Sequence, residues 1–381
     1  MILFDNKFGK PILYIFLVLL ALLVTAYFYL SDTRIRTNET FFTPPETTNI
    51  ASNDGEQYIE VIADDLNVPW EIVFLPSGDM LVTERQGAVI QIGKERKRFS
   101  IENVEAIGEG GLLGMALHPN YEQNDWIYLY LTTKNRGKYI NRVERYRFDG
   151  SGFFDRTIII DNIPAGANHN GGRILFGPDD FLYITTGDAE SPDLAQDENS
   201  LAGKILRLKD NGDTPEDNPF GNEVWSYGHR NPQGLAFDNQ GRLWATEHGR
   251  SGVLSGLDEL NLIEKGKNYG WPIIQGNETA NDTQTPVINS GVNETWAPAG
   301  LVYINNRLFF AGLRGQSIYE VAVSDEGVIG SLKVHLKRKF GRIRAIKVGP
   351  DGFLYISTSN TDGRGSPGAN DDRIIKVNPE F

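Results

Sequence analysis

Pro350-Asp-Gly-Phe-Leu-Tyr-Ile-Ser357 is a tight turn followed by a strand of large residues. The same turn and strand recur at Pro76–Thr83, Asn124–Thr132, Pro178–Thr185, Asn239–Thr246 and Asn305–Ala311. Each turn contains glycine, asparagine or aspartate, the residues that tolerate the backbone angles of tight turns. Successive copies end about 46 to 65 residues apart, near the length of a four-stranded propeller blade with its loops.

Six copies predict an all-β fold, a six-bladed β-propeller of four-stranded antiparallel blades over residues 58–381. One such sheet cannot cover both of its faces, so neighbouring sheets must stack around an axis. A ring also needs closing, and Tyr58–Ile62 and Arg373–Val377 are expected to share one blade. A β-sandwich with irregular loops is the alternative, but the repeat covers nearly the whole body of the chain.

The N-terminal segment differs from the rest. Pro11–Ser31 contains no charged residue and is long enough to cross a bilayer as one helix. Residues 1–31 are therefore expected to form a short cytoplasmic tip and a transmembrane anchor. Residues 32–57, rich in Thr, Asn, Pro and Glu, are expected to form a flexible linker.

A cleavable signal peptide is the alternative interpretation, with Val24 and Ala26 as small residues near a cut site. The first interpretation predicts a single-pass protein of the cell membrane, with an extracytoplasmic body. The second predicts secretion after cleavage. Four Asn-X-Thr sequons weakly support export in either case, at Asn38, Asn277, Asn281 and Asn293.

Composition excludes several functional classes. The net charge is −13 with no long basic run, which argues against a nucleic-acid partner. The absence of cysteine excludes disulfides, thiolate metal sites and cysteine nucleophiles. No Gly-x-Gly-x-x-Gly follows a strand and opens a helix, so a nicotinamide dinucleotide fold has no support.

Two polar segments next to the repeats could carry chemistry. In Asn168–Arg173, His169 is flanked by Asn and Asn-Gly-Gly, where a near-neutral imidazole could serve as a general base or could merely cap a turn. In Gly228–Leu235, Arg230 stands before Asn231-Pro232, a constrained turn suited to holding a carboxylate or carbonyl. An ordinary solvated arginine is the alternative there.

Arg342 and Arg344 flank Ile343, so a strand would place both guanidinium groups on one face. Two adjacent like charges are unfavourable unless an anion bridges them, which favours an anionic ligand over an exposed pair. Carboxylates and turn carbonyls also cluster in three nearby segments, and they suit a hard cation such as calcium, although not in an EF-hand. These segments are Glu247–Arg250, Asp258–Asn261 and Asn268–Pro272.

As a set, these segments resemble the glucose/sorbosone dehydrogenase family, in particular the soluble aldose sugar dehydrogenases that use pyrroloquinoline quinone (PQQ) with calcium. The resemblance covers roughly residues 58–379. The matching motifs are Gly108-Glu-Gly-Gly-Leu-Leu-Gly114, His169-Asn-Gly-Gly-Arg173, Gly177-Pro-Asp-Asp-Phe-Leu-Tyr-Ile-Thr-Thr-Gly-Asp188, Gly228-His-Arg-Asn-Pro-Gln-Gly-Leu235, Asp258-Glu-Leu-Asn-Leu-Ile263, Asn268-Tyr-Gly-Trp-Pro272 and Arg342-Ile-Arg344.

The resemblance implies a six-bladed propeller that oxidises aldoses to lactones, passing hydride from the anomeric carbon to the quinone. It implies that His169 is the general base and that Arg230 stabilises charge at the reacting centre. The residues implied at the cofactor are Glu109, Asn231, Gly312, Leu313, Arg314, Arg342 and Arg344. Those implied at the sugar are Asn168 and Asp188. Backbone carbonyls of Gly249 and Arg250 correspond to the catalytic calcium ligands, and Glu259 and Tyr269 to a separate structural calcium site.

The chain departs from the family pattern at several positions. Glu109 stands where well-known members have Gln, and an unpaired carboxylate there would repel an anionic quinone. Asn168 replaces an Asp that contacts sugar, and Arg250 replaces Pro. The segment between Gly249 and Asp258 is longer than usual, and Trp296-Ala-Pro-Ala-Gly300 is shortened. These departures bear on substrate identity and cofactor affinity.

Three functions remain open at this stage. The leading hypothesis is an aldose oxidoreductase whose partners are a small sugar, an unknown electron acceptor and the membrane. A propeller that binds a partner without turnover is the second, and a calcium-dependent lactonase or hydrolase is the third. The base and the paired arginines favour the first, because a lactonase needs no anion clamp.

Overall fold

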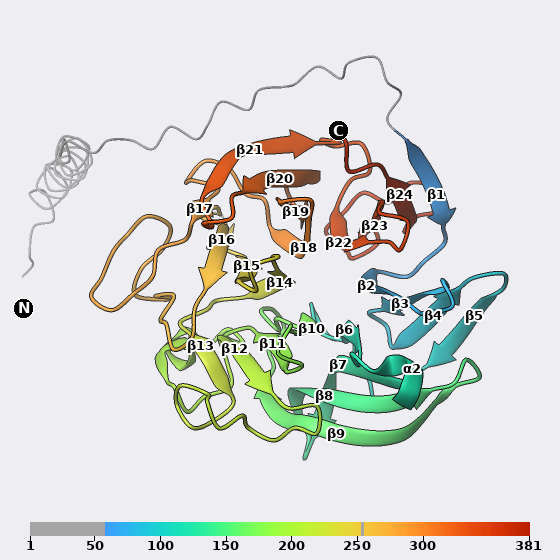
Figure 1. Ribbon diagram of the computed structural model, residues 1–381, viewed down its shortest axis with the longest axis horizontal. Coiled ribbons are helices and arrows are strands. Elements are labelled where there is room, and N and C mark those ends of the chain that lie inside the picture. The colour runs from blue at the N-terminus through green and yellow to red at the C-terminus, as the bar shows by residue number, and fades with distance from the viewer. Residues whose placement is uncertain (1–57, 253–254) are drawn as a thin grey trace, which may run out of the picture. The chain divides into compact units, whose positions relative to one another are not determined.

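In the computed structural model, which describes residues 58–252 and 255–381, six four-stranded antiparallel sheets surround a central axis (Figure 1). The predicted six-bladed propeller is confirmed. Blade 1 consists of β2 (Pro69–Phe74), β3 (Met80–Glu84), β4 (Ala88–Ile92) and β5 (Arg96–Ser100). Blade 2 consists of β6 (Leu112–Leu117), β7 (Trp126–Asn135), β8 (Lys138–Phe148) and β9 (Phe153–Pro164). Blade 3 consists of β10 (Ile174–Phe176), β11 (Leu182–Thr186), β12 (Lys204–Leu208) and β13 (Val224–Tyr227).

The second half of the ring repeats this plan. Blade 4 consists of β14 (Pro232–Phe237), β15 (Leu243–Glu247), β16 (Glu259–Ile263) and β17 (Ile288–Asn289). Blade 5 consists of β18 (Pro298–Ile304), β19 (Arg307–Gly312), β20 (Ser317–Val323) and β21 (Ile329–His335). The first strand of each blade lies nearest the axis, as Figure 1 shows, and these strands contact one another around the ring.

Blade 6 closes the ring with strands from both ends of the described chain. It consists of β22 (Ile343–Val348), β23 (Leu354–Thr358), β24 (Ile374–Val377) and, outermost, β1 (Ile59–Ala63). β1 pairs with β24 in antiparallel register, with Ile59 opposite Val377. This confirms the predicted pairing of Tyr58–Ile62 with Arg373–Val377.

Each repeated motif forms the second strand of a blade and the turn before it. Three of these turns place Gly78 at φ 90°, Asp180 at φ 61° and Gly352 at φ 79°. Glycine and aspartate are among the residues that adopt this left-handed region at low cost. The turn residues therefore recur because the same backbone conformation connects the first two strands.

The core is divided among six clusters within the described residues, one at each junction between neighbouring blades. Because each blade packs on both faces, β3, β11, β15 and β23 are buried along their whole length. That double burial explains why the repeated strands are runs of large apolar residues without an exposed polar face.

The predicted transmembrane anchor and linker, residues 1–57, lie outside the described residues. Within residues 58–252 and 255–381, the helices are α2 (Tyr121–Asn124) and the 3-10 helix η1 (Pro192–Gln196). No helix in this part of the chain combines the length and apolarity needed to cross a membrane.

Candidate active site

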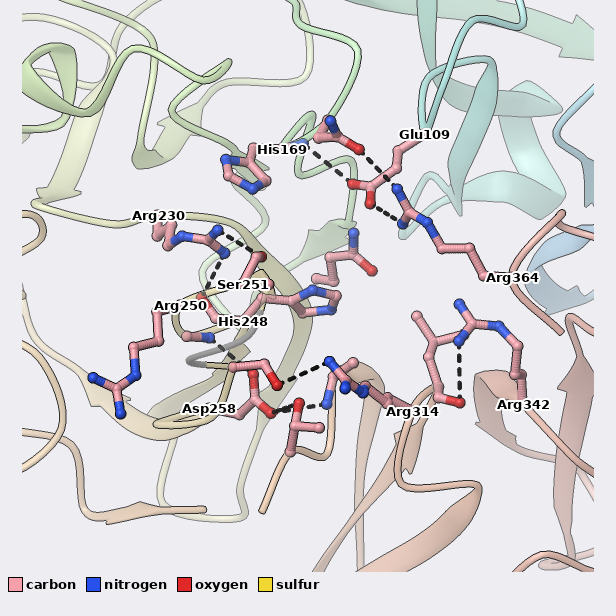
Figure 2. A pocket seen from close by; sticks show the side chains of 18 of the residues that line it. Glu109, His169, Arg230, His248, Arg250, Ser251, Asp258, Arg314, Arg342 and Arg364 are labelled. Carbon is pink, nitrogen blue, oxygen red and sulfur yellow. Dashed lines mark hydrogen bonds and ion pairs between the residues drawn. The ribbon is translucent and has the colours of Figure 1, made fainter. Parts of the chain in front are cut away.

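A cavity of about 490 Å³ lies at the end of the ring where the first strands begin and the second strands end. Figure 2 shows the side chains that converge on it. Ten predicted site residues line it: Glu109, Asn168, His169, Arg230, Gly249, Arg250, Leu313, Arg314, Arg342 and Arg344. The other five, Asp188, Asn231, Glu259, Tyr269 and Gly312, lie outside its lining. The antiparallel blades bring these distant segments together because every loop at this end belongs to the same rim.

His169 is held by a buried carboxylate. Its Nδ1 lies 2.7 Å from Asp188 Oδ1, and Asp188 is completely buried while the His169 side chain keeps 16% of its surface exposed. The other Asp188 oxygen accepts a hydrogen bond from Trp271 Nε1 at 2.9 Å. An ionised Asp188 makes Nδ1 the donor and leaves His169 Nε2 free to accept a proton. His169 therefore presents an imidazole with a free acceptor nitrogen in the lining of the cavity.

The backbone around His169 is shaped for this contact. His169 has φ 58°, a left-handed conformation that is costly for a residue with a side chain. A Cβ atom on Gly187, which precedes Asp188, would lie 1.9 Å from the His169 carbonyl oxygen. Glycine at this position lets the end of β11 approach His169 closely enough for the hydrogen bond to form.

Asp188 was expected to contact the sugar. Its burial and its hydrogen bonds to His169 and Trp271 instead place it behind His169, outside the cavity lining. Asn168, also expected at the sugar, does line the cavity, and its side-chain amide donates to Glu190 Oε1 at 2.9 Å.

Arg230 lies near His169 in the cavity lining (Figure 2). Its Nη2 donates to Ser251 Oγ at 2.8 Å, its guanidinium stands 5.2 Å from the centre of the Trp271 ring, and its buried Nε has no partner. Burial lowers the pKa of this guanidinium. The Arg230 carbonyl accepts from the Asp188 amide at 2.8 Å, which couples the two segments. The next residue, Asn231, is completely buried, and its Nδ2 also lacks a partner.

Arg342 and Arg344 both line the cavity while Ile343 packs in the core, so the predicted same-face geometry is confirmed. Arg342 is already paired, because its Nε and Nη2 donate to Asp362 Oδ2 at 2.9 and 2.8 Å. Arg344 has only a neutral partner, Gln233 Oε1 at 3.0 Å, and burial lowers its pKa to about 9. The Asp362 carboxylate thus balances the charge of Arg342, and Arg344 is left without an anionic hydrogen-bond partner.

The loop after β19 supplies the other predicted cofactor contacts. Arg314 donates to Ser255 Oγ at 2.9 Å, and Leu313 lines the cavity while its carbonyl accepts from Arg342 Nη1 at 3.4 Å. Gly312 lies behind them, where a Cβ would come within 2.7 Å of the Tyr319 ring. Gly312 therefore serves packing.

Glu109 is paired. Its carboxylate accepts hydrogen bonds from Arg364 and from the His169 backbone amide, the latter at 3.2 Å. Burial alone would raise its pKa, but Arg364 and nearby positive charge lower the pKa to about 2. The repulsion expected of an unpaired carboxylate near an anionic cofactor is therefore offset by Arg364.

The family model for glucose/sorbosone dehydrogenases matches residues 66–367. The chain belongs to the glucose/sorbosone dehydrogenase family. It is 33% identical over 359 residues to an aldose sugar dehydrogenase of Escherichia coli, an alignment covering 84% of this chain and 92% of that protein.

Two solved structures extend the comparison. The PQQ-bound aldose sugar dehydrogenase of Streptomyces coelicolor has a TM-score of 0.79 and 36% identity, covering 86% of this chain and 99% of its own. The apo form of a soluble aldose sugar dehydrogenase from Escherichia coli has a TM-score of 0.75 and 31% identity, covering 85% and 99%.

The charge of the cavity lining is complementary to that of PQQ, the quinone bound by the relative from Streptomyces coelicolor. The lining holds six arginines and three carboxylates, an excess of three positive charges in a protein whose net charge is −13. PQQ is a planar quinone with three carboxylates. The nitrogens of Arg230 and Arg344 that lack partners are buried donors of the kind that a ligand would satisfy.

The described residues contain no group of three His, Asp or Glu side chains suited to a metal ion. A calcium ion in this cavity would therefore need backbone carbonyls, such as those expected at Gly249 and Arg250. Asp258 fixes this loop, accepting from the Gly249 amide at 2.9 Å and from the Ala297 amide at 2.9 Å. The Arg250 carbonyl accepts from the Gly256 amide at 3.3 Å, so this hydrogen bond would compete with a metal.

Glu259 and Tyr269 line a separate small pocket. Burial and the nearby Glu247 raise the pKa of Glu259, and the buried Oε1 of Gln275 has no partner. Oxygen atoms without a counter-charge fit a hard cation. The Tyr269 hydroxyl donates to the Leu262 carbonyl at 2.5 Å and accepts from the Glu264 amide, so only its backbone carbonyl could take part.

Sequence reasoning missed Asp362, Arg364 and His248 at this site. All three follow the second strand of a blade, β23 or β15, at the cavity end. Asp188 follows β11 in the same way. Polar residues directly after a repeated strand therefore indicate positions at the cavity. The polar run Ser359-Asn-Thr-Asp-Gly-Arg364 after β23 is such a sequence.

Proposed function

We propose that this protein oxidises the anomeric hydroxyl of an aldose to the lactone, with PQQ and calcium as its cofactors. One observation carries the proposal: the oriented His169–Asp188 pair opens onto a cavity lined by an excess of arginines. A base poised beside a cationic cavity suits proton removal next to an anionic redox cofactor. The PQQ-bound relative from Streptomyces coelicolor supports the choice of cofactor.

The protein's own residues would bind, orient and deprotonate the substrate. His169 Nε2 takes the proton of the anomeric hydroxyl, while Asp188 holds Nδ1 and stabilises the imidazolium that forms. Arg230 lies beside the base, where its guanidinium stabilises negative charge on the sugar oxygen. Bound PQQ would supply the hydride acceptor, and calcium would supply Lewis-acid polarisation of that acceptor.

Arg344, Arg342 and Arg314 would hold the carboxylates of the quinone. Arg344 and Arg314 have only neutral partners, whereas Arg342 already carries Asp362. Carboxylates gain charge-assisted hydrogen bonds from such groups. We therefore assign most of the cofactor affinity to Arg344 and Arg314, and we place calcium at the Gly249 and Arg250 carbonyls.

Reconstitution tests the proposal. The purified protein is titrated with PQQ in the presence and absence of calcium, and dye reduction is then measured with a panel of aldoses. We expect saturable quinone binding and calcium-dependent dye reduction. A protein that binds no quinone would support the binding-protein alternative, and hydrolysis of lactones without quinone would support the lactonase.

Two variants make the cofactor assignment specific. Arg344→Ala should weaken quinone binding by about tenfold or more, because it removes a buried cation without releasing an unpaired carboxylate. Lys97→Ala, an exposed cation in β5, should leave binding unchanged. Equal quinone affinity in the parent protein and Arg344→Ala would contradict the assignment.

We also propose that residues 11–31 anchor the protein in the cell membrane with the propeller outside the cytoplasm. The uncharged length of this run supports an anchor over a cleaved signal. Cell fractionation and external protease treatment test it: an anchored protein remains in membranes and is digested from outside. A soluble form beginning near Tyr27 would indicate signal cleavage and secretion.

A further inference from the structure

Arg364 reaches into the cavity from the loop between β23 and β24 of the closing blade. Its guanidinium donates to Glu109 and, at 2.8 Å, to Asn168 Oδ1. Asn168 in turn donates to Glu190 through its backbone and its side chain at 3.1 and 2.9 Å. These four side chains, Glu109, Arg364, Asn168 and Glu190, form one hydrogen-bonded band on the wall beside the base, which we call the mouth network.

The mouth network meets His169 directly. Glu109 accepts from the His169 backbone amide at 3.2 Å, and Asn168 is the preceding residue. Figure 2 shows Glu109 and Arg364 close together near His169, with Arg314 and Asp258 on the opposite side of the cavity. A sugar held at His169 Nε2 would therefore lie beside this band.

The mouth network and the rest of the cavity lining differ in their balance of charged side chains. The mouth network contains two carboxylates and one arginine, whereas the rest of the lining contains five arginines and one carboxylate. Within the network, the two terminal nitrogens of Arg364 donate hydrogen bonds to Glu109 and Asn168. Arg364, the lining cation of this band next to His169, is thus already paired with a carboxylate of the protein.

We propose that the Glu109–Arg364 ion pair makes the sugar side of the cavity select uncharged aldoses over anionic ones, so that Arg364 is a specificity-determining residue. The inference rests on the proposed aldose oxidation. A free guanidinium at this position would attract a sugar carboxylate through charge-assisted hydrogen bonds, whereas the paired guanidinium attracts it less because Glu109 balances its charge. An anionic sugar would then bind less well, because its carboxylate would find no unpaired cation at this position.

D-Glucose and D-glucuronate form a suitable test pair, because both present the same anomeric hydroxyl and only the second carries a carboxylate. In the quinone-loaded parent protein, kcat/KM for glucose should exceed that for glucuronate by about tenfold or more. Glu109→Gln frees Arg364 and should move this ratio toward glucuronate by about tenfold. Arg364→Gln leaves Glu109 unpaired and should move it toward glucose.

The double variant Glu109→Gln/Arg364→Gln should lose most of the shift of the first variant, because neither charge remains. Glu380→Gln, which breaks an exposed pair with Arg307, is the matched control and should leave the ratio unchanged. Thermal unfolding and PQQ titration of each variant separate altered selectivity from misfolding or cofactor loss.

The outcomes distinguish the two proposals. A parent protein that binds no quinone, or oxidises no aldose, overturns the proposed function and this inference with it. A parent protein that oxidises glucose and glucuronate equally well overturns the inference alone. The same holds if folded, quinone-binding Glu109→Gln keeps the parental ratio within about twofold.

Discussion

At the scale of single residues, His169 depends on groups that do not touch the cavity. Asp188 is completely buried and contacts Nδ1 of His169, and Trp271 holds the second Asp188 oxygen. Gly187 allows the close approach that brings them together. Several residues therefore hold His169 in place, and under the proposed base role, changes behind it should affect turnover more than binding.

His169→Ala should reduce kcat by about a hundred- to ten-thousand-fold, because a positioned base contributes that much to proton transfer. Asp188→Asn should reduce kcat with a smaller change in quinone affinity, because the amide no longer dictates which imidazole nitrogen carries the proton. Steady-state rates with a good sugar and quinone titrations check both variants. Near-parental kcat in folded His169→Ala contradicts the assignment of the base.

Glu109 should make stability depend on acid pH. Its pKa of about 2 in the folded protein lies below the ordinary value of about 4.3 for an unfolded chain. Ionised Glu109 therefore stabilises the fold above about pH 4.3, and this contribution is lost as the pH falls toward about 2. Urea unfolding at pH 6 and pH 3 should show a larger loss in the parent protein than in Glu109→Gln. The exposed Glu102→Gln should follow the parent protein.

At the scale of elements, η1 illustrates how a loop is fixed beside the site. Lys204 in β12 is completely buried, and its Nζ donates to the carbonyls of Leu194, Ala195 and Ala202 at 2.8, 3.0 and 2.6 Å. Gln196, at the end of η1, donates to the Trp271 carbonyl at 2.6 Å. Lys204 thus holds η1 in place, and η1 in turn contacts Trp271, which donates to Asp188.

Lys204→Met should therefore lower the free energy of unfolding by about 3 kcal/mol, because several buried carbonyls lose their donor. We also expect a lower kcat, since η1 would no longer hold Trp271 against Asp188. Denaturant unfolding and steady-state rates measure the two effects. Lys97→Met, on an exposed strand, is the control and should change neither. An unfolding free energy equal to that of the parent protein would show that Lys204 is not a support.

At the scale of the whole molecule, the ring depends on the pairing between β1 and β24. β1 covers the edge of β24, and β24 in turn joins β23. Without β1, the backbone groups of β24 would face solvent, and one junction of the ring would lose part of its cover. Both ends of the propeller domain should therefore be required for full stability.

Two truncations separate this role from that of the preceding segment. Removing residues 1–57 should leave the unfolding midpoint of the propeller close to that of the full chain. Removing residues 1–63, which takes β1 as well, should lower the midpoint by several degrees and promote aggregation through the exposed edge. Thermal unfolding and light scattering on both forms measure the effect. Identical behaviour of the two forms would contradict the ring-closure role.

Turns and strands that depend on neighbouring residues were enough to predict the six-bladed architecture from the sequence. Turns that need left-handed residues, such as Gly78, Asp180 and Gly352, recur at blade spacing, and strands buried on both faces must be apolar. Alternation around Ile343 likewise predicted Arg342 and Arg344 on one face, and both line the cavity. These features depend on residues close together in the chain, so the sequence by itself carried them.

Only the tertiary structure decided the partners of the charged groups. It brought Arg364 to Glu109 across 255 positions of sequence, gave Arg342 a counter-charge in Asp362, and buried Asp188 behind His169. No local pattern encodes such pairs, because each depends on which loops the closed ring brings to one rim. The blades therefore follow from the sequence alone, and the charge balance of the cavity follows from how the ring closes.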